Sequence, residues 1–177
     1  MRGPVTLFAI VLAGFGVAPA AVPQGADILL NCTACHSLAP RQPDAETEAA
    51  PPRIYPDLNG QPVRYLARQL EAYRLGLRQH PQMAATATAL GDGASAMARL
   101  YADAPMPALA EYVGAEAFPT AHVLVTDGDW SRGLPSCNAC HGLDEDDRAR
   151  LAPRLHGQPA AYLSGQLRAY AEGTRRS

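Results

Sequence analysis

The chain has 177 residues, with 15 basic and 17 acidic side chains, and because it contains no lysine every cation is an arginine. A length of this order suits one ordinary domain or two small ones. No basic stripe runs along the sequence, so nucleic acid is not expected as a partner.

The first twenty residues are expected to be an export signal rather than part of the fold. Arg2 supplies a positive start, Val5 to Val17 is an apolar run, and residues 18–20 form a small-residue cleavage site. The apolar run is short for a membrane span. We therefore expect removal of residues 1–20 and location in the periplasm, with membrane contact only indirect or through an uncleaved signal.

The pattern Cys-x-x-Cys-His occurs twice, first directly after a short apolar helix expected over residues 27–33. Its members are Cys32, Cys35 and His36 in the first copy, and Cys137, Cys140 and His141 in the second. Two thiols three residues apart share one face of a helical turn, spaced to form thioethers with the two vinyl groups of a haem. The histidine then directs an imidazole at the iron. The pattern predicts two covalently bound haem c groups.

Disulfides and a zinc site are the alternatives for four cysteines. Zinc sites with paired cysteines usually separate the pairs by roughly 15–20 residues. Here the pairs lie about a hundred residues apart, and each is followed by a histidine. The spacing therefore favours haem.

The segments that follow the two motifs are copies of one another. Residues 55–79 and 152–176 align without gaps at a constant offset of 97, and 13 of the 25 positions are identical. Each copy has a proline where a helix would start and a glycine where it would end, which predicts helices over 62–76 and 159–173. A last helix of the first copy is expected over 108–117, and no segment alternates like a strand. The sequence predicts an all-α fold with a boundary near residues 118–128.

These combined motifs resemble class I c-type cytochromes, and the duplication resembles the periplasmic di-haem cytochromes of the cytochrome c-four kind. Similar units occur as cytochrome subunits of periplasmic dehydrogenases, including flavocytochromes. The resemblance implies that Pro56 and Pro153 orient the two imidazoles through their carbonyl groups. It also implies that Met83 is the distal ligand of the first iron.

The second copy departs from this pattern, because the position equivalent to Met83 would be 180 and the sequence given ends at Ser177. We expect the second domain to be truncated before its distal-ligand loop. A longer parent protein, a native truncation that leaves an open iron site, and completion by a partner subunit all stay open.

The resulting expectation is two tandem class I cytochrome c domains: 21–118, a linker over 119–128, and an incomplete domain over 129–177. The expected function is single-electron transfer in a respiratory chain, without catalysis. The partners would be redox proteins such as a respiratory complex, an oxidase or a dehydrogenase. The alternatives are a dehydrogenase cytochrome subunit and a protein with a reactive second haem.

Overall fold

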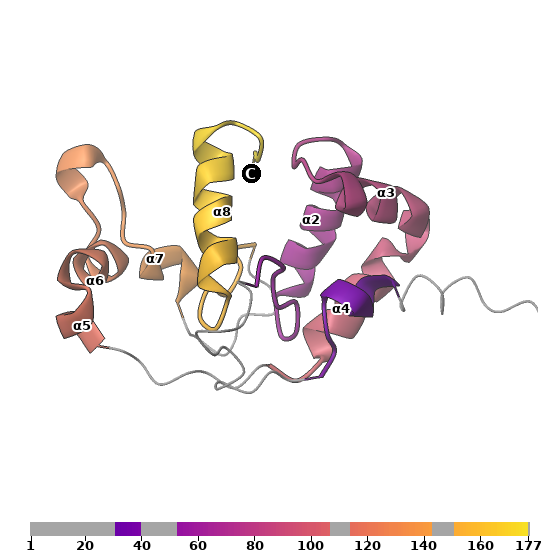
Figure 1. Ribbon diagram of the computed structural model, residues 1–177, viewed down its shortest axis with the longest axis horizontal. Helices are drawn as coiled ribbons and strands as arrows, with labels where there is room; N and C mark the ends of the chain where they lie inside the picture. The colour runs from indigo at the N-terminus through magenta and orange to yellow at the C-terminus, as the bar shows by residue number, and fades with distance from the viewer. Residues whose placement is uncertain (1–30, 40–52, 107–113, 143–150, 177) are drawn as a thin grey trace, which may run out of the picture.

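The computed structural model describes residues 31–39, 53–106, 114–142 and 151–176, and these parts of the chain are helices joined by loops (Figure 1). Residues 31–35 are helical. The further helices are α2 (Val63–Arg74), α3 (Pro81–Leu90), η2 (Gly91–Gly93), α4 (Ala94–Asp103), α5 (Gly114–Ala117), α6 (Pro119–Thr126), η3 (Trp130–Arg132), α7 (Asn138–His141) and α8 (Ala160–Ala171). Extended pairing within the described ranges is limited to isolated bridges. The all-α prediction is confirmed.

The two repeated helices begin and end in the same way. Pro62 precedes α2 and Pro159 precedes α8, with backbone angles that differ by only a few degrees. Gly76 and Gly173 follow the helices at φ +70° and +71°. Only glycine adopts this left-handed conformation without a steric cost, so both helices end at the predicted position.

The core of the first unit lies where α2 packs against α3 and α4. Its buried members are Tyr65, Leu66, Ala98, Tyr101 and Ala102. Tyr101 is only 2% exposed, and its hydroxyl donates a 2.7 Å hydrogen bond to the carbonyl of His36. A helix about 65 residues downstream is thereby tied to the end of the first Cys-x-x-Cys-His motif.

The helix that closes this core is α4, whereas a last helix of the first copy was expected over 108–117. Residues 107–113 lie outside the described ranges, and 114–117 form α5, which contacts α6 instead. No helix was predicted over residues 94–103, where α4 follows directly after the short turn η2. In α4 the buried residues are Ala98, Tyr101 and Ala102. Tyr101 and Ala102 are three and four positions after Ala98, so all three lie on one face of the helix.

The expected linker over 119–128 contains helix α6. Pro119 occupies its first turn, where a missing backbone N–H costs no hydrogen bond. Several apolar side chains of this segment stay on the surface, with Phe118 66% exposed and Val123 50% exposed. The segment is therefore a helical connection between the two repeats.

Helices α2 and α8 lie side by side, and the chain after α8 reaches the turn that follows α2 (Figure 1). Two glutamine side chains join their N-terminal ends. Gln61 donates to the carbonyl of Arg154 and accepts from its N–H, both at 2.9 Å. Gln158 makes the same pair of bonds to Asp57, at 2.7 and 3.0 Å.

Two buried arginines join the other ends of these helices. Arg78 donates to Gln69, Tyr162 and Gln166 at 2.8–2.9 Å. Arg175 donates to the corresponding set, Gln166, Tyr65 and Gln69, at 2.7–3.2 Å. The guanidinium groups also stack 4.6 and 4.7 Å from the ring centres of Tyr73 and Tyr170. The two repeats are thus held together by side chains that are the same in each.

Among the described residues, no helix has the length and apolar character needed to cross a membrane. The proposed signal, residues 1–20, lies outside the described ranges.

Replacing Tyr101 with Phe should destabilise the protein by about 1–2 kcal/mol, because the carbonyl of His36 loses a buried donor. Chemical denaturation of the holoprotein measures the change. Tyr55→Phe is the control, because Tyr55 is 42% exposed, and its effect should be within about 0.5 kcal/mol. Equal effects of the two substitutions would contradict a stabilising role of the hydrogen bond from Tyr101 to His36.

Replacing Gly60 with Ala should cost more than replacing Gly76 with Ala. Both residues have positive φ, so each substitution carries a backbone cost of roughly 1 kcal/mol. A Cβ at Gly60 would also collide with Cγ of Met106, whereas nothing lies within 4 Å of a Cβ at Gly76. Thermal unfolding of both variants tests the order, and a larger loss for Gly76→Ala would be inconsistent with it.

Candidate functional site

The first Cys-x-x-Cys-His motif forms one helical turn. Residues 31–35 are helical, and the N–H of His36 donates to the carbonyl of Cys32 at 2.8 Å. Cys32 is half-buried against the core, while Cys35 is exposed. Because both thiols project from one turn, a single flat group can reach both of them.

The imidazole of His36 is held in one orientation. Its Nδ1 lies 2.9 Å from the carbonyl oxygen of Pro56. A carbonyl can only accept, so Nδ1 carries the proton and Nε2 is left with a lone pair. The ring is 7% exposed, and Tyr55 lies edge-on to it with the ring centres 6.3 Å apart. This is the geometry of a metal ligand whose outer nitrogen is fixed.

The electrostatics around His36 favour the neutral imidazole. Burial lowers the pKa of His36 below its usual range, and nearby Arg78 and His80 act in the same direction. The hydrogen bond to Pro56 and the charge of Asp57 oppose this shift only in part. Since a metal binds the neutral ring, the site does not have to lose a proton first.

The second motif reproduces this arrangement. Helix α7 begins directly after Cys137 and contains the rest of the motif, and the N–H of His141 donates to the carbonyl of Cys137 at 2.9 Å. Nδ1 of His141 lies 2.7 Å from the carbonyl oxygen of Pro153. His141 is only half-buried, and Cys137 and Cys140 are exposed. The structure therefore brings each predicted histidine together with its predicted proline.

The residues of both motifs fit a covalently attached haem better than zinc. All four thiols are unpaired, and within the described ranges no three metal-binding side chains are gathered into a cluster. Burial raises the pKa of the Cys32 thiol, which disfavours the thiolate that zinc requires. Each motif instead offers two thiols and one free imidazole nitrogen, which is the donor set of haem c.

Met83 lies in the first turn of α3, half-buried. Its N–H donates to Nδ1 of His80 at 3.3 Å, so His80 caps the helix. Of the other methionines, Met97 packs against the core cluster that includes Cys32, and Met106 lies against Gly60.

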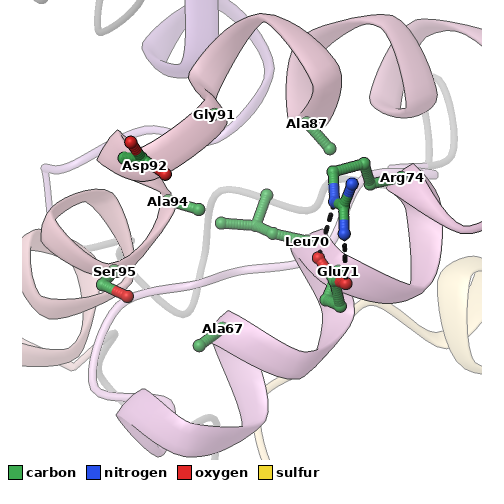
Figure 2. Close-up of a pocket in the computed structure, with 9 residues that line it drawn as sticks. All are labelled: Ala67, Leu70, Glu71, Arg74, Ala87, Gly91, Asp92, Ala94 and Ser95. Carbon is green, nitrogen blue, oxygen red and sulfur yellow. Dashed lines mark hydrogen bonds and ion pairs between the residues drawn. The ribbon is translucent and has the colours of Figure 1, made fainter.

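A pocket of about 340 Å³ lies elsewhere on the first unit, between α2, α3, η2 and α4 (Figure 2). Leu70 points into it, and the Arg74–Glu71 ion pair lies at its rim (Figure 2). No residue of either cysteine motif lines it. Leu167, the counterpart of Leu70 in α8, is 72% exposed because no described helix covers that side of α8.

Two residues that support the first site were not recognised from the sequence. Tyr101 lies in α4, a helix that was not predicted from the sequence. Asn59 is 5% exposed and donates to the carbonyl of Leu38 at 3.1 Å, which ties down the chain after His36. The equivalent residue of the second copy is His156. Because the two residues differ, the identities between the copies did not point to Asn59. The helical spacing of Ala98, Tyr101 and Ala102 is the sequence signal that could have revealed Tyr101 as a buried residue.

Comparison with known proteins agrees with this geometry. The cytochrome c family model matches residues 22–115. A thiosulfate dehydrogenase electron acceptor of Thiomonas intermedia is 33% identical, over 91% of this chain and 72% of the relative. Cytochrome c4 of Azotobacter vinelandii is 30% identical, over 81% of this chain and 69% of the relative.

The fold is also similar to a solved structure. Reduced recombinant cytochrome c4 from Pseudomonas stutzeri superposes with a TM-score of 0.64 at 26% sequence identity, covering 86% of this chain and 80% of that one. The duplicated motifs, the equivalent His–Pro pairs and these similarities lead to one conclusion. The chain belongs to the cytochrome c family, with the tandem architecture of the di-haem class I c-type cytochromes.

Proposed function

We propose that this chain is a periplasmic electron carrier that holds two haem c groups and accepts single electrons from a dehydrogenase. The observation that carries the proposal is the pair of equivalent sites, each with two thiols and an imidazole held by a proline carbonyl. The relative that is named as an electron acceptor of thiosulfate dehydrogenase supports a dehydrogenase as donor. Bound haem supplies one-electron chemistry at its iron.

The proposed roles of the residues follow from their chemistry. Cys32, Cys35, Cys137 and Cys140 tether the two haems through thioether bonds. His36 and His141 are the proximal ligands, and Pro56 and Pro153 orient them. Because the outer N–H of each ring is fixed by a carbonyl, the ring would be held in one orientation when haem is bound, and electron transfer would need little rearrangement of these residues.

Met83 is our proposed distal ligand of the first iron. Two observations support it over the other methionines. His80, three residues before Met83, is among the charges that lower the pKa of His36, which supports an approach of the start of α3 to the first site. Met97 instead packs against the core cluster, and Met106, which is 40% exposed, lies against Gly60. Because His80 uses Nδ1 to cap α3, ligation by that nitrogen would cost the helix its cap.

The interface with redox partners should bury little surface area, and the complex should be short-lived, because rapid electron transfer requires fast dissociation. Without residues 1–20 the chain carries 14 basic and 17 acidic side chains, because Arg2 is the one charged residue that is lost. With this low net charge, local patches rather than a strong overall field would guide the encounter.

A reactive second haem is the alternative. It is favoured by the greater exposure of the second site, where His141 is half-buried while His36 is buried. Carbon monoxide separates the two functions, because it binds a ferrous haem whose sixth position is open. Binding at the second haem would favour the reactive protein, and absence of binding would favour a pure carrier.

The mature protein should contain two haems per chain, and Cys137→Ser/Cys140→Ser should leave one. Intact mass and a pyridine haemochrome assay measure both numbers. The matched variant Cys32→Ser/Cys35→Ser should leave only the second haem. A mature chain that weighs no more than its amino acids would disprove the proposal.

Met83→Leu should lower the midpoint potential of one haem by on the order of 0.1 V, within the roughly 0.8 V range that axial ligands span. The thioether favours ferrous iron, and leucine cannot replace it. The weak thioether-to-iron absorption band should disappear, and that haem should gain carbon monoxide binding. Met97→Leu is the control. Loss of the band in the control instead would assign the ligand to Met97.

A further inference from the structure

In the contact between the two repeats, equivalent residues of each repeat make equivalent hydrogen bonds to the other. Among the described residues, four side chains of the first unit that take part in this contact have the same residue type 97 positions later. These side chains are Gln61, Tyr65, Gln69 and Arg78, matched by Gln158, Tyr162, Gln166 and Arg175. Each bond from the first unit to the second has an equivalent bond in the opposite direction. The contact therefore has approximate twofold symmetry.

At two positions of the contact the copies differ, and the hydrogen bonds there use the backbone of these residues alone. Asp57 corresponds to Arg154, but the glutamines bind only their backbone N–H and carbonyl groups. Leu77 corresponds to Thr174, and again only the carbonyls accept, at 2.8 and 3.0 Å. The divergent side chains take no part in these bonds.

An interface of this kind is what two identical units would form. In a twofold dimer, residue i of one copy contacts residue j of the other, and j contacts i. A second copy of the first unit would present Gln61 to the backbone of Asp57, and Arg78 to Tyr65 and Gln69. All the donors and acceptors in the present contact would find partners of the same chemical type.

The charge at the centre does not forbid such a dimer. Arg78 and Arg175 are 6% and 7% exposed and share the amide oxygens of Gln69 and Gln166. The chain already accommodates two guanidinium groups at this place, held by amide and phenol oxygens. Two copies of Arg78 would bring together the same charges and the same acceptors.

We propose that the dyad face of the first unit, formed by Asp57, Gln61, Tyr65, Gln69, Tyr73 and Arg78, is a self-complementary docking surface for the same face of a second chain. In the intact protein the second repeat covers it. A linked partner has an effective concentration in the millimolar range, so it outcompetes a second molecule. The surface becomes available when the second unit can no longer pair with it.

The test uses the full-length holoprotein with the second face disabled by Gln158→Ala/Gln166→Arg. The first change removes both glutamine bonds to Asp57, and the second adds a third cation beside Arg78 and Arg175. The first unit is unchanged. We expect a concentration-dependent doubling of mass in sedimentation velocity that the wild-type protein does not show.

The matched control adds the equivalent changes to the first unit, Gln61→Ala/Gln69→Arg. This quadruple variant should return to the mass of the wild-type protein, because neither face remains. If the altered second unit loses its fold, which circular dichroism would reveal, the first face is still uncovered and the doubling is still expected. A double variant with wild-type mass, or a quadruple variant that associates equally, would overturn the proposal.

Discussion

The hydrogen bond from a histidine ring to a proline carbonyl is the contact on which both sites depend. It appears twice, from His36 to Pro56 and from His141 to Pro153, at 2.9 and 2.7 Å. Each bond fixes the tautomer, so that the other ring nitrogen can bind a metal. The loop that carries the proline leads directly into the repeated helix. The position of each ring is therefore coupled to the position of α2 or α8.

That coupling links the sites to the contact between the units. The glutamine pairs bind backbone groups at Asp57 and Arg154, next to the two prolines that hold the rings. The buried arginines fix the opposite ends of the same helices. With both ends held, the two sites keep a defined separation. A carrier that passes electrons between its own haems benefits from such rigidity, because transfer weakens steeply with distance.

The second unit presents the same ligand geometry with less cover. Its helix α8 buries Tyr162 against the first unit but leaves Leu167 exposed. In the first unit, α3 and α4 pack on α2, and Tyr101 of α4 binds the carbonyl of His36. The described part of the second unit shows no equivalent of that bond. Among the described residues, the two proposed ligands therefore differ in exposure, with His36 buried and His141 half-buried.

Sequence and tertiary structure determined different parts of this protein. Three features could be recognised from the sequence: the cysteine spacing, the histidine that follows it and the repeat at offset 97. Covalent attachment and helix ends depend on residues that are close together in the sequence. Helix α6 lies in the segment that was expected to be a linker, because Pro119 and Gly128 mark its ends, and no helix was predicted over α4. Only the folded chain could bring Tyr101 to His36 or Arg78 to Gln166, because such bonds join residues 65 to 88 positions apart. The identity of the proposed ligands is thus a property of the sequence, and the twofold contact that holds their supporting helices is a property of the packing.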